Sequence, residues 1–171
     1  MMDEFTPTMN EEFRMYAGLR LRRHYLLLDE EDDSQEIAVV EEQMEALWEH
    51  FDAIQLQSLS GMGSDLNWIR RNCEPPPNGR KTPEDVSALD RQELEVAMKS
   101  KDWHRILHYM RLCAPSFRPA SVARERGITY AAIGLPKYAS VFEARAIQFG
   151  AARAVSEVET LDTGFLTRKS G

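Results

Sequence analysis

An apolar residue recurs at every third or fourth position between residues 37 and 54, and this spacing constrains the fold more than any other feature of the chain. A repeat of about 3.6 residues places such positions on one face of a helix, whereas a half-buried strand would need strict alternation. The acidic residues of the segment fall mostly outside the apolar stripe. We therefore predict a helix over residues 34–57. The stripe consists of Ile37, Val40, Met44, Leu47, Phe51 and Ile54.

A second helical pattern precedes the first, over residues 10–28. The acidic run Asp29 to Asp33 separates the two patterns, and Asp33 with Glu36 resembles a capping box at a helix start. Two helices joined by a short connection pack as antiparallel neighbours. We therefore expect residues 1–57 to form a helical hairpin. The residues that share one face of the first helix are Phe13, Tyr16, Ala17, Arg20, His24 and Leu27.

Glycine and proline residues interrupt the helical pattern in the middle of the chain. Gly61 and Gly63 interrupt the helical pattern, and Ser64 can cap a short helix that follows them. Three consecutive prolines and an Asn-Gly pair then exclude a helix over residues 74–82. Thr82 and Pro83 have the residue types of a helix start. The expected organisation is an N-terminal part at 1–73, a linker at 74–82, a helical part at 83–155 and a tail at 156–171.

The segment 120–151 carries a pattern of small and bulky residues at helical spacing. Gly127 is followed by Tyr130, and Ala139 is followed by Phe142 and Ala146, with Gly134 at the turn and Pro136 at the next helix start. This pattern resembles the tetratricopeptide repeat, a pair of antiparallel helices that cross at small residues. A weaker copy covers residues 87–118, with Ile106 at the position of the small alanine.

The resemblance implies two helical hairpins that recognise another protein, usually through the first helix of each hairpin. It implies no chemistry. Two repeats are fewer than an independent solenoid needs. The expected fold is therefore all-α, with the N-terminal hairpin packed on two C-terminal hairpins of the tetratricopeptide type.

Charge is distributed unevenly along the chain. Residues 1–66 contain 16 acidic and 4 basic side chains, whereas residues 67–171 contain 12 acidic and 17 basic ones, within a net charge of -7. Two explanations stay open at this point. The basic half can pair with the acidic half of the same molecule, or it can attract an external acidic partner.

Known catalytic and cofactor patterns are not found in the sequence. His104 and His108 can share a helix face, but a zinc site needs at least three protein ligands, and we expect no metal. Gly79, Arg80, Lys81 and Thr82 lack the preceding glycine and strand of a phosphate-binding loop. Neither Cys73 nor Cys113 has the neighbours of a nucleophile. We expect no cofactor and no catalytic residue.

The compartment is expected to be the cytoplasm. The acidic N-terminus does not resemble a secretory signal, and no apolar run approaches the roughly 20 residues of a membrane span. Two cysteines far apart in sequence are typical of reduced thiols.

The leading functional hypothesis is a non-enzymatic helical adaptor or accessory subunit that docks an acidic or amphipathic segment of another protein. The alternative is a nucleic-acid-associated protein that uses the same basic half, and a third class is an enzyme completed by another subunit. The predicted binding residues are Trp103, Arg105, Tyr109, Arg111, Arg124, Arg126 and Arg145.

Overall fold

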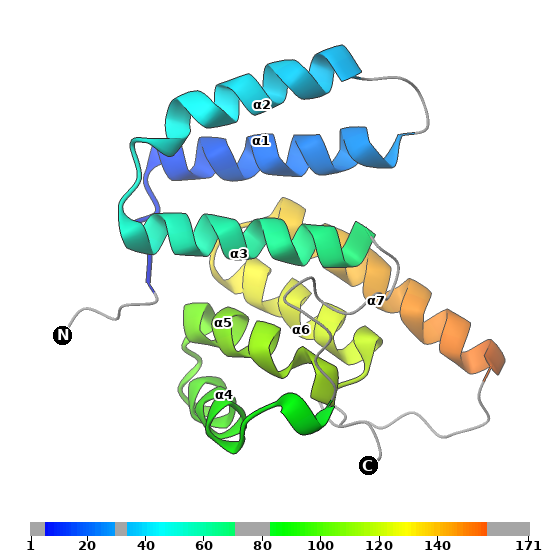
Figure 1. Ribbon diagram of the computed structural model, residues 1–171. Coiled ribbons are helices and arrows are strands. Elements are labelled where there is room, and N and C mark those ends of the chain that lie inside the picture. The colour runs from blue at the N-terminus through cyan, green and yellow to red at the C-terminus, as the bar shows by residue number, and fades with distance from the viewer. Residues whose placement is uncertain (1–5, 30–33, 71–82, 157–171) are drawn as a thin grey trace. The chain divides into compact units, whose positions relative to one another are not determined.

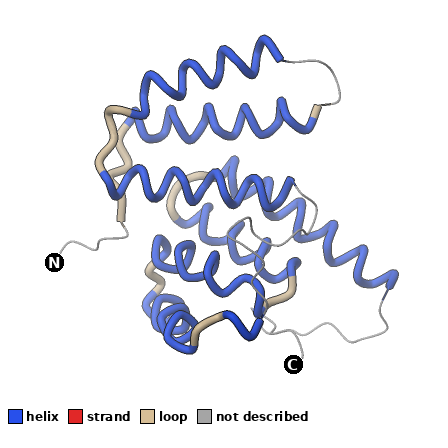
Figure 2. The backbone as a smooth tube through the Cα atoms, in the orientation of Figure 1, coloured by secondary structure: helices blue, strands red, loops and turns tan. Residues whose placement is uncertain are grey.

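The computed structural model describes residues 6–29, 34–70 and 83–156, with the backbone alone for residues 151–156. Across these ranges the chain forms seven α-helices, two short 3₁₀ helices and no β-strand (Figures 1 and 2). The all-α prediction is confirmed. The chain divides into two compact units, residues 1–72 and 73–171. The predicted linker at 74–82 and the predicted tail after residue 156 lie outside the described residues.

The first unit consists of α1 (Glu11–Leu28), α2 (Ser34–Trp48) and α3 (Ala53–Arg70), with α1 between the other two (Figure 1). The side chain of Asn10 accepts a hydrogen bond from the Phe13 backbone N–H and so caps α1. The predicted first helix, 10–28, is therefore confirmed. The capping pair expected at Asp33 and Glu36 falls partly outside the described residues.

The second predicted helix was too long, because the chain turns after Trp48. The side chain of Asp52 accepts a hydrogen bond from the Gln55 N–H, and the Gln55 side chain accepts one from the Asp52 N–H. This reciprocal pair is a capping box, which starts a new helix at Ala53. The apolar stripe continues in sequence through Phe51 and Ile54, but these residues follow the end of α2. The first unit thus consists of the pair α1 and α2 and a third helix, α3, which begins inside the range predicted for the second helix.

The short helix expected after Gly63 is also wrong, because α3 runs without interruption through Gly61 and Gly63. A glycine inside a helix costs only about 0.5–1 kcal/mol relative to alanine. The buried residues Leu59, Met62 and Leu66 supply the packing that outweighs this cost. Tertiary contacts therefore decide the conformation of this segment.

An aromatic cluster joins α1 to the turn between α2 and α3. The ring of Tyr16 lies 5.4 Å from that of Trp48 and 5.6 Å from that of Phe51, measured between centroids. Phe13 meets Phe51 edge to face at 6.4 Å. Such pairs contribute about 0.5–1.5 kcal/mol beyond the burial of their area. The cluster fixes the position of the turn against the first two turns of α1.

The second unit begins with η1 (Pro83–Asp85) and continues with α4 (Ala88–Ser100) and α5 (Trp103–Cys113). The cap of α4 is Ser87, whose hydroxyl accepts from the Asp90 N–H, so the helix does not start at Thr82 and Pro83 as predicted. Lys101 adopts a left-handed conformation, with φ of 55°, at the turn into α5. The cap of α5 is Asp102.

The remaining elements are η2 (Ala114–Ser116), α6 (Pro119–Ala132) and α7 (Pro136–Ser156). Gly134 has a φ of 89°, which an L side chain would adopt only with strain. The backbone N–H of Leu135 donates to the Tyr130 carbonyl and closes the turn. The sequence placed this turn and the following Pro136 correctly.

α7 packs closely against α6 at Gly127. A Cβ atom at this position would lie 3.3 Å from the carbonyl oxygen of Ala139 and 3.0 Å from Cγ of Glu143. Next to it, the ring of Tyr130 stacks on that of Phe142 at a centroid distance of 5.3 Å. The predicted facing of Gly127 and Ala139 is confirmed. Whether the two hairpins form a tetratricopeptide arrangement stays a prediction.

We expect Gly127→Leu to destabilise the second unit by about 1–3 kcal/mol, because the added atoms overpack a backbone-to-backbone contact. The matched control is Gly18→Leu in α1, where nothing lies within 4 Å of the added carbon. Thermal unfolding followed by circular dichroism measures both. Equal melting midpoints for the two variants would show that α6 and α7 do not approach each other at Gly127.

Candidate functional site

Four of the predicted binding residues lie on α5, and all four are only partly exposed: Trp103, Arg105, Tyr109 and Arg111. The Arg105 guanidinium is 3.8 Å from the Glu93 carboxylate on α4 and 3.3 Å from that of Asp102. Arg105 therefore pairs inside its own unit. Tyr109 lies one turn beyond Arg105 on the same side of the helix.

The two predicted residues on α6 point in opposite directions. Arg124 is exposed, whereas Arg126 is 1% exposed. Residues two positions apart on a helix are separated by about 200° around its axis, so both cannot face the same surface. The prediction that Arg126 belongs to a binding surface is therefore corrected, because its side chain is not accessible. It is a buried cation of the second unit.

Arg145 on α7 is held by neighbours on the same helix. Its guanidinium carbon lies 4.8 Å from the centre of the Phe149 ring, and its Nη1 donates to the Gln148 side chain at 2.7 Å. A cation over an aromatic face is an attractive arrangement at such distances. The seven predicted residues therefore do not share one surface, and Arg124 is the most accessible arginine among them.

The acidic helix α2 has basic partners on α1. Arg23 donates to Glu41 at 2.7 Å, and Arg22 lies 3.7 Å from Glu36. These exposed pairs contribute about 0–1 kcal/mol each. Part of the acidic surplus of the first unit is thus balanced within that unit.

No group of three or more potential metal ligands occurs among the described residues. The rings of His108 and Tyr109 contact each other at a centroid distance of 4.9 Å. Cys113 is a buried residue of α5.

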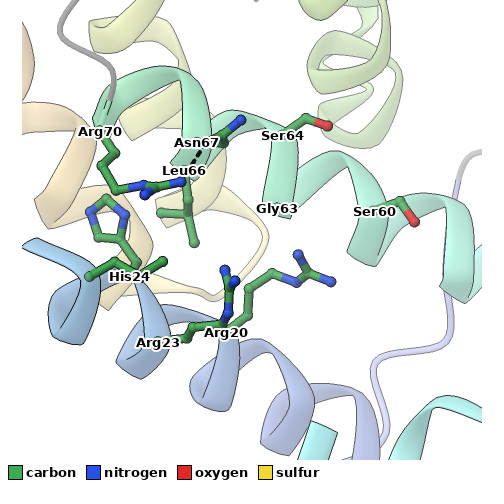
Figure 3. Close-up of a pocket in the computed structure, with 10 residues that line it drawn as sticks. Arg20, Arg23, His24, Ser60, Gly63, Ser64, Leu66, Asn67 and Arg70 are labelled. Atoms are coloured by element: carbon green, nitrogen blue, oxygen red, sulfur yellow. Dashed lines mark hydrogen bonds between the residues drawn. The ribbon is translucent and has the colours of Figure 1, made fainter. Parts of the chain in front are cut away.

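A basic pocket between α1 and α3 was not predicted from the sequence. Its volume is about 440 Å³ (Figure 3). Arg20 and Arg23 extend from α1 toward α3, and Arg70 lies at the opposite end of the pocket beside His24 (Figure 3). The full lining consists of Arg20, Arg23, His24, Leu27, Ser60, Gly63, Ser64, Leu66, Asn67 and Arg70. We call this the α1–α3 pocket.

The head of Arg20 occupies the space beside Gly63. A Cβ atom added at Gly63 would collide with Nη1 of Arg20. Nη2 of the same guanidinium donates to the Tyr16 hydroxyl at 3.0 Å, and its carbon lies 5.3 Å from the Tyr16 ring centre. The glycine that was expected to break the helix thus admits an arginine from the neighbouring helix.

The other end of the pocket combines a cation with a neutral histidine. Nη2 of Arg70 donates to the Asn67 side chain at 2.6 Å. Burial, with a smaller contribution from the Arg70 charge, lowers the pKa of His24 to about 4. His24 is therefore uncharged near neutral pH, and the positive charge of the pocket comes from the arginines.

One signal in the sequence pointed to this pocket. Arg20 and His24 lie on the same helical face as Phe13, Tyr16 and Ala17, which are buried. Polar and cationic side chains on an apolar face need partners or a function. Arg23 adds a second cation one turn from Arg20.

Comparison with protein-family models, with curated proteins and with solved structures gave no match to this chain. In the described part of the chain, no helix has the length and hydropathy that would let it cross a membrane.

We expect His24 to make the first unit less stable in mild acid. Its pKa is about 4 when folded and 6.5 when unfolded, so the unfolded chain binds the extra proton between these values. Stability is therefore retained above pH 6.5 and falls toward pH 4, by up to about 1.4 kcal/mol per pH unit.

The measurement compares urea unfolding of the native chain with His24→Gln between pH 7 and pH 4. Burial also raises the pKa of Glu125, which acts in the opposite direction, but this carboxyl is common to both proteins and cancels in the difference. His50→Gln removes an exposed histidine of the same unit and serves as the control. A difference between native and His24→Gln that stays constant with pH would contradict the assignment.

Proposed function

We propose that the chain is a non-enzymatic helical adaptor whose second unit docks an amphipathic, acidic segment of another protein. The observation that carries this proposal is the exposed strip of α6. Most side chains of that helix are buried, but Arg124 and Ile128 are exposed one turn apart. A cation and an aliphatic side chain at this spacing complement a helix that has an acidic and an apolar residue one turn apart.

The first helix of the other hairpin supports the same proposal. On α4, Leu89 and Val96 are 64% and 54% exposed and lie two turns apart on one side of the helix. Large apolar side chains that repeat along one exposed face are typical of protein-binding helices. In the tetratricopeptide resemblance, α4 and α6 are the first helices of their hairpins, which are the helices that usually meet the partner.

The contacts of the arginines favour a protein partner over nucleic acid. Arg126 is buried, and Arg105 and Arg145 are engaged by neighbours in their own unit. Nucleic-acid binding depends on many cations that reach phosphates together. Fewer accessible arginines weaken that alternative and leave a mixed apolar and cationic surface.

We expect Arg124→Glu with Ile128→Ser to abolish capture of the partner while leaving the melting midpoint nearly unchanged, because exposed charges contribute about 0–1 kcal/mol. Chemical crosslinking and affinity capture from the native host are the assay. Lys137→Glu reverses an exposed charge on α7 and is the matched control. Identical sets of captured proteins for all three chains would contradict the α6 strip as a binding surface. Capture of nucleic acid that decreases steeply with salt would favour the alternative.

We expect Arg126→Glu to behave differently from Arg124→Glu. A buried cation replaced by a buried anion loses its electrostatic partners, which costs about 3–5 kcal/mol. The second unit of Arg126→Glu should therefore melt at a much lower temperature. If Arg126→Glu melts like the native chain, then Arg126 is accessible and returns to the candidate surface.

A further inference from the structure

The α1–α3 pocket combines concentrated positive charge with room for a ligand. We propose that it binds a small molecule through a phosphate or pyrophosphate group. Among the described residues that line it, three have guanidinium groups, Arg20, Arg23 and Arg70, and none is an aspartate or a glutamate (Figure 3). The first unit as a whole has an acidic surplus, so this local excess of positive charge does not follow from its composition.

Ion pairs with carboxylates do not by themselves explain why these arginines lie at the α1–α3 pocket. Arg22, next to Arg23 in sequence, extends away from the pocket and lies near Glu36 on α2. Arg23 has the carboxylate of Glu41 as a partner, and Glu41 is outside the pocket lining. Like charges gathered around one cavity repel each other, and an anion between them removes that cost.

Arg20 is the residue best prepared for an anion. Its Nε atom is buried and has no hydrogen-bond partner in the structure, so one donor of the guanidinium is left unsatisfied. The hydrogen bond from its Nη2 to the Tyr16 hydroxyl keeps the guanidinium beside the Tyr16 ring. A planar guanidinium held in this way matches the oxygen geometry of phosphate.

The absence of a side chain at Gly63 makes room for the head of Arg20. The guanidinium occupies the volume where any other residue at position 63 would carry its Cβ atom. Alanine at this position would therefore displace the guanidinium.

The dimensions of the pocket indicate more than a single phosphate. A volume of about 440 Å³ lies within the range of small-molecule sites. Leu27 and Leu66 add apolar surface beside the cations, whereas Ser60, Ser64 and Asn67 add neutral polar groups. The chemistry therefore fits a compound with one or two phosphates and a small organic part.

The test uses the full-length chain and pyrophosphate, inorganic phosphate and citrate as probes, at low ionic strength, with amide NMR shifts as the readout. We expect pyrophosphate to bind with a Kd of about 1 mM or below. The shifts should concentrate at Gly63, Ser64, Asn67 and the residues around Arg20. Inorganic phosphate should bind more weakly at the same amides. No saturable shift with pyrophosphate, or citrate binding as tightly as pyrophosphate, would overturn the proposal.

Two variants and a matched control make the assignment specific. Arg20→Gln should weaken pyrophosphate binding about tenfold or more, since a lost charge-assisted contact contributes 1.4 kcal/mol or above. Gly63→Ala should weaken it similarly while the helix stays folded, because the methyl group displaces the guanidinium. Arg22→Gln removes an exposed arginine of the same helix, and this variant should bind pyrophosphate within about twofold of the native chain.

Equal weakening by Arg22→Gln and Arg20→Gln would show binding by surface charge alone and would overturn the proposal. If Arg20→Gln does not fold, the comparison of Gly63→Ala with Arg22→Gln decides in the same way.

Discussion

At one glycine in α3 and one in α6, a neighbouring helix fills the space that a side chain would need. At Gly127 the neighbour is the backbone of α7, and at Gly63 it is the guanidinium of Arg20. Each glycine costs its helix about 0.5–1 kcal/mol relative to alanine. The cost is offset by close packing of α6 on α7 in one unit and by the position of Arg20 in the other. The close approach of α7 to α6 and the position of Arg20 in the α1–α3 pocket both depend on these missing side chains.

The distribution of charge illustrates the difference between composition and a binding site. The N-terminal third of the chain is strongly acidic, yet the α1–α3 pocket within it is lined by three arginines. The C-terminal half is basic, yet Arg126 is buried, and Arg105 is paired with carboxylates. The field at a surface depends on which side chains reach it, since burial and pairing alter how each charge acts. A net charge counted along the sequence therefore neither located the arginines of the α1–α3 pocket nor distinguished the buried Arg126 from the exposed Arg124.

Helix boundaries were predictable where one sequence feature, such as a turn residue or a helical apolar pattern, acted without an opposing one. The start of α1 followed from the helical pattern over residues 10–28, and the turn at Gly134 and the start of α7 at Pro136 followed from turn chemistry. Two errors came from competition between signals. At residues 49–52 the apolar spacing continued across a turn, and the capping box of Asp52 and Gln55 determined the start of α3. At Gly61 and Gly63 packing outweighed the low helix propensity of glycine.

The α1–α3 pocket was missed because it needs Arg20 and Gly63 side by side, and these residues are 43 positions apart in the sequence.

The central claim is that Gly63 and Gly127 are contact points between helices and not breaks in them. A ¹³C-edited nuclear Overhauser experiment on the native chain tests this directly, since it reports protons that lie within about 5 Å of each other. We expect cross-peaks from the α-protons of Gly63 to the side chain of Arg20, and from those of Gly127 to Ala139 and Glu143. We also expect helical carbon shifts without interruption through residues 53–70. Coil-like shifts at Gly61 to Gly63, with no cross-peak between Gly63 and Arg20, would contradict it.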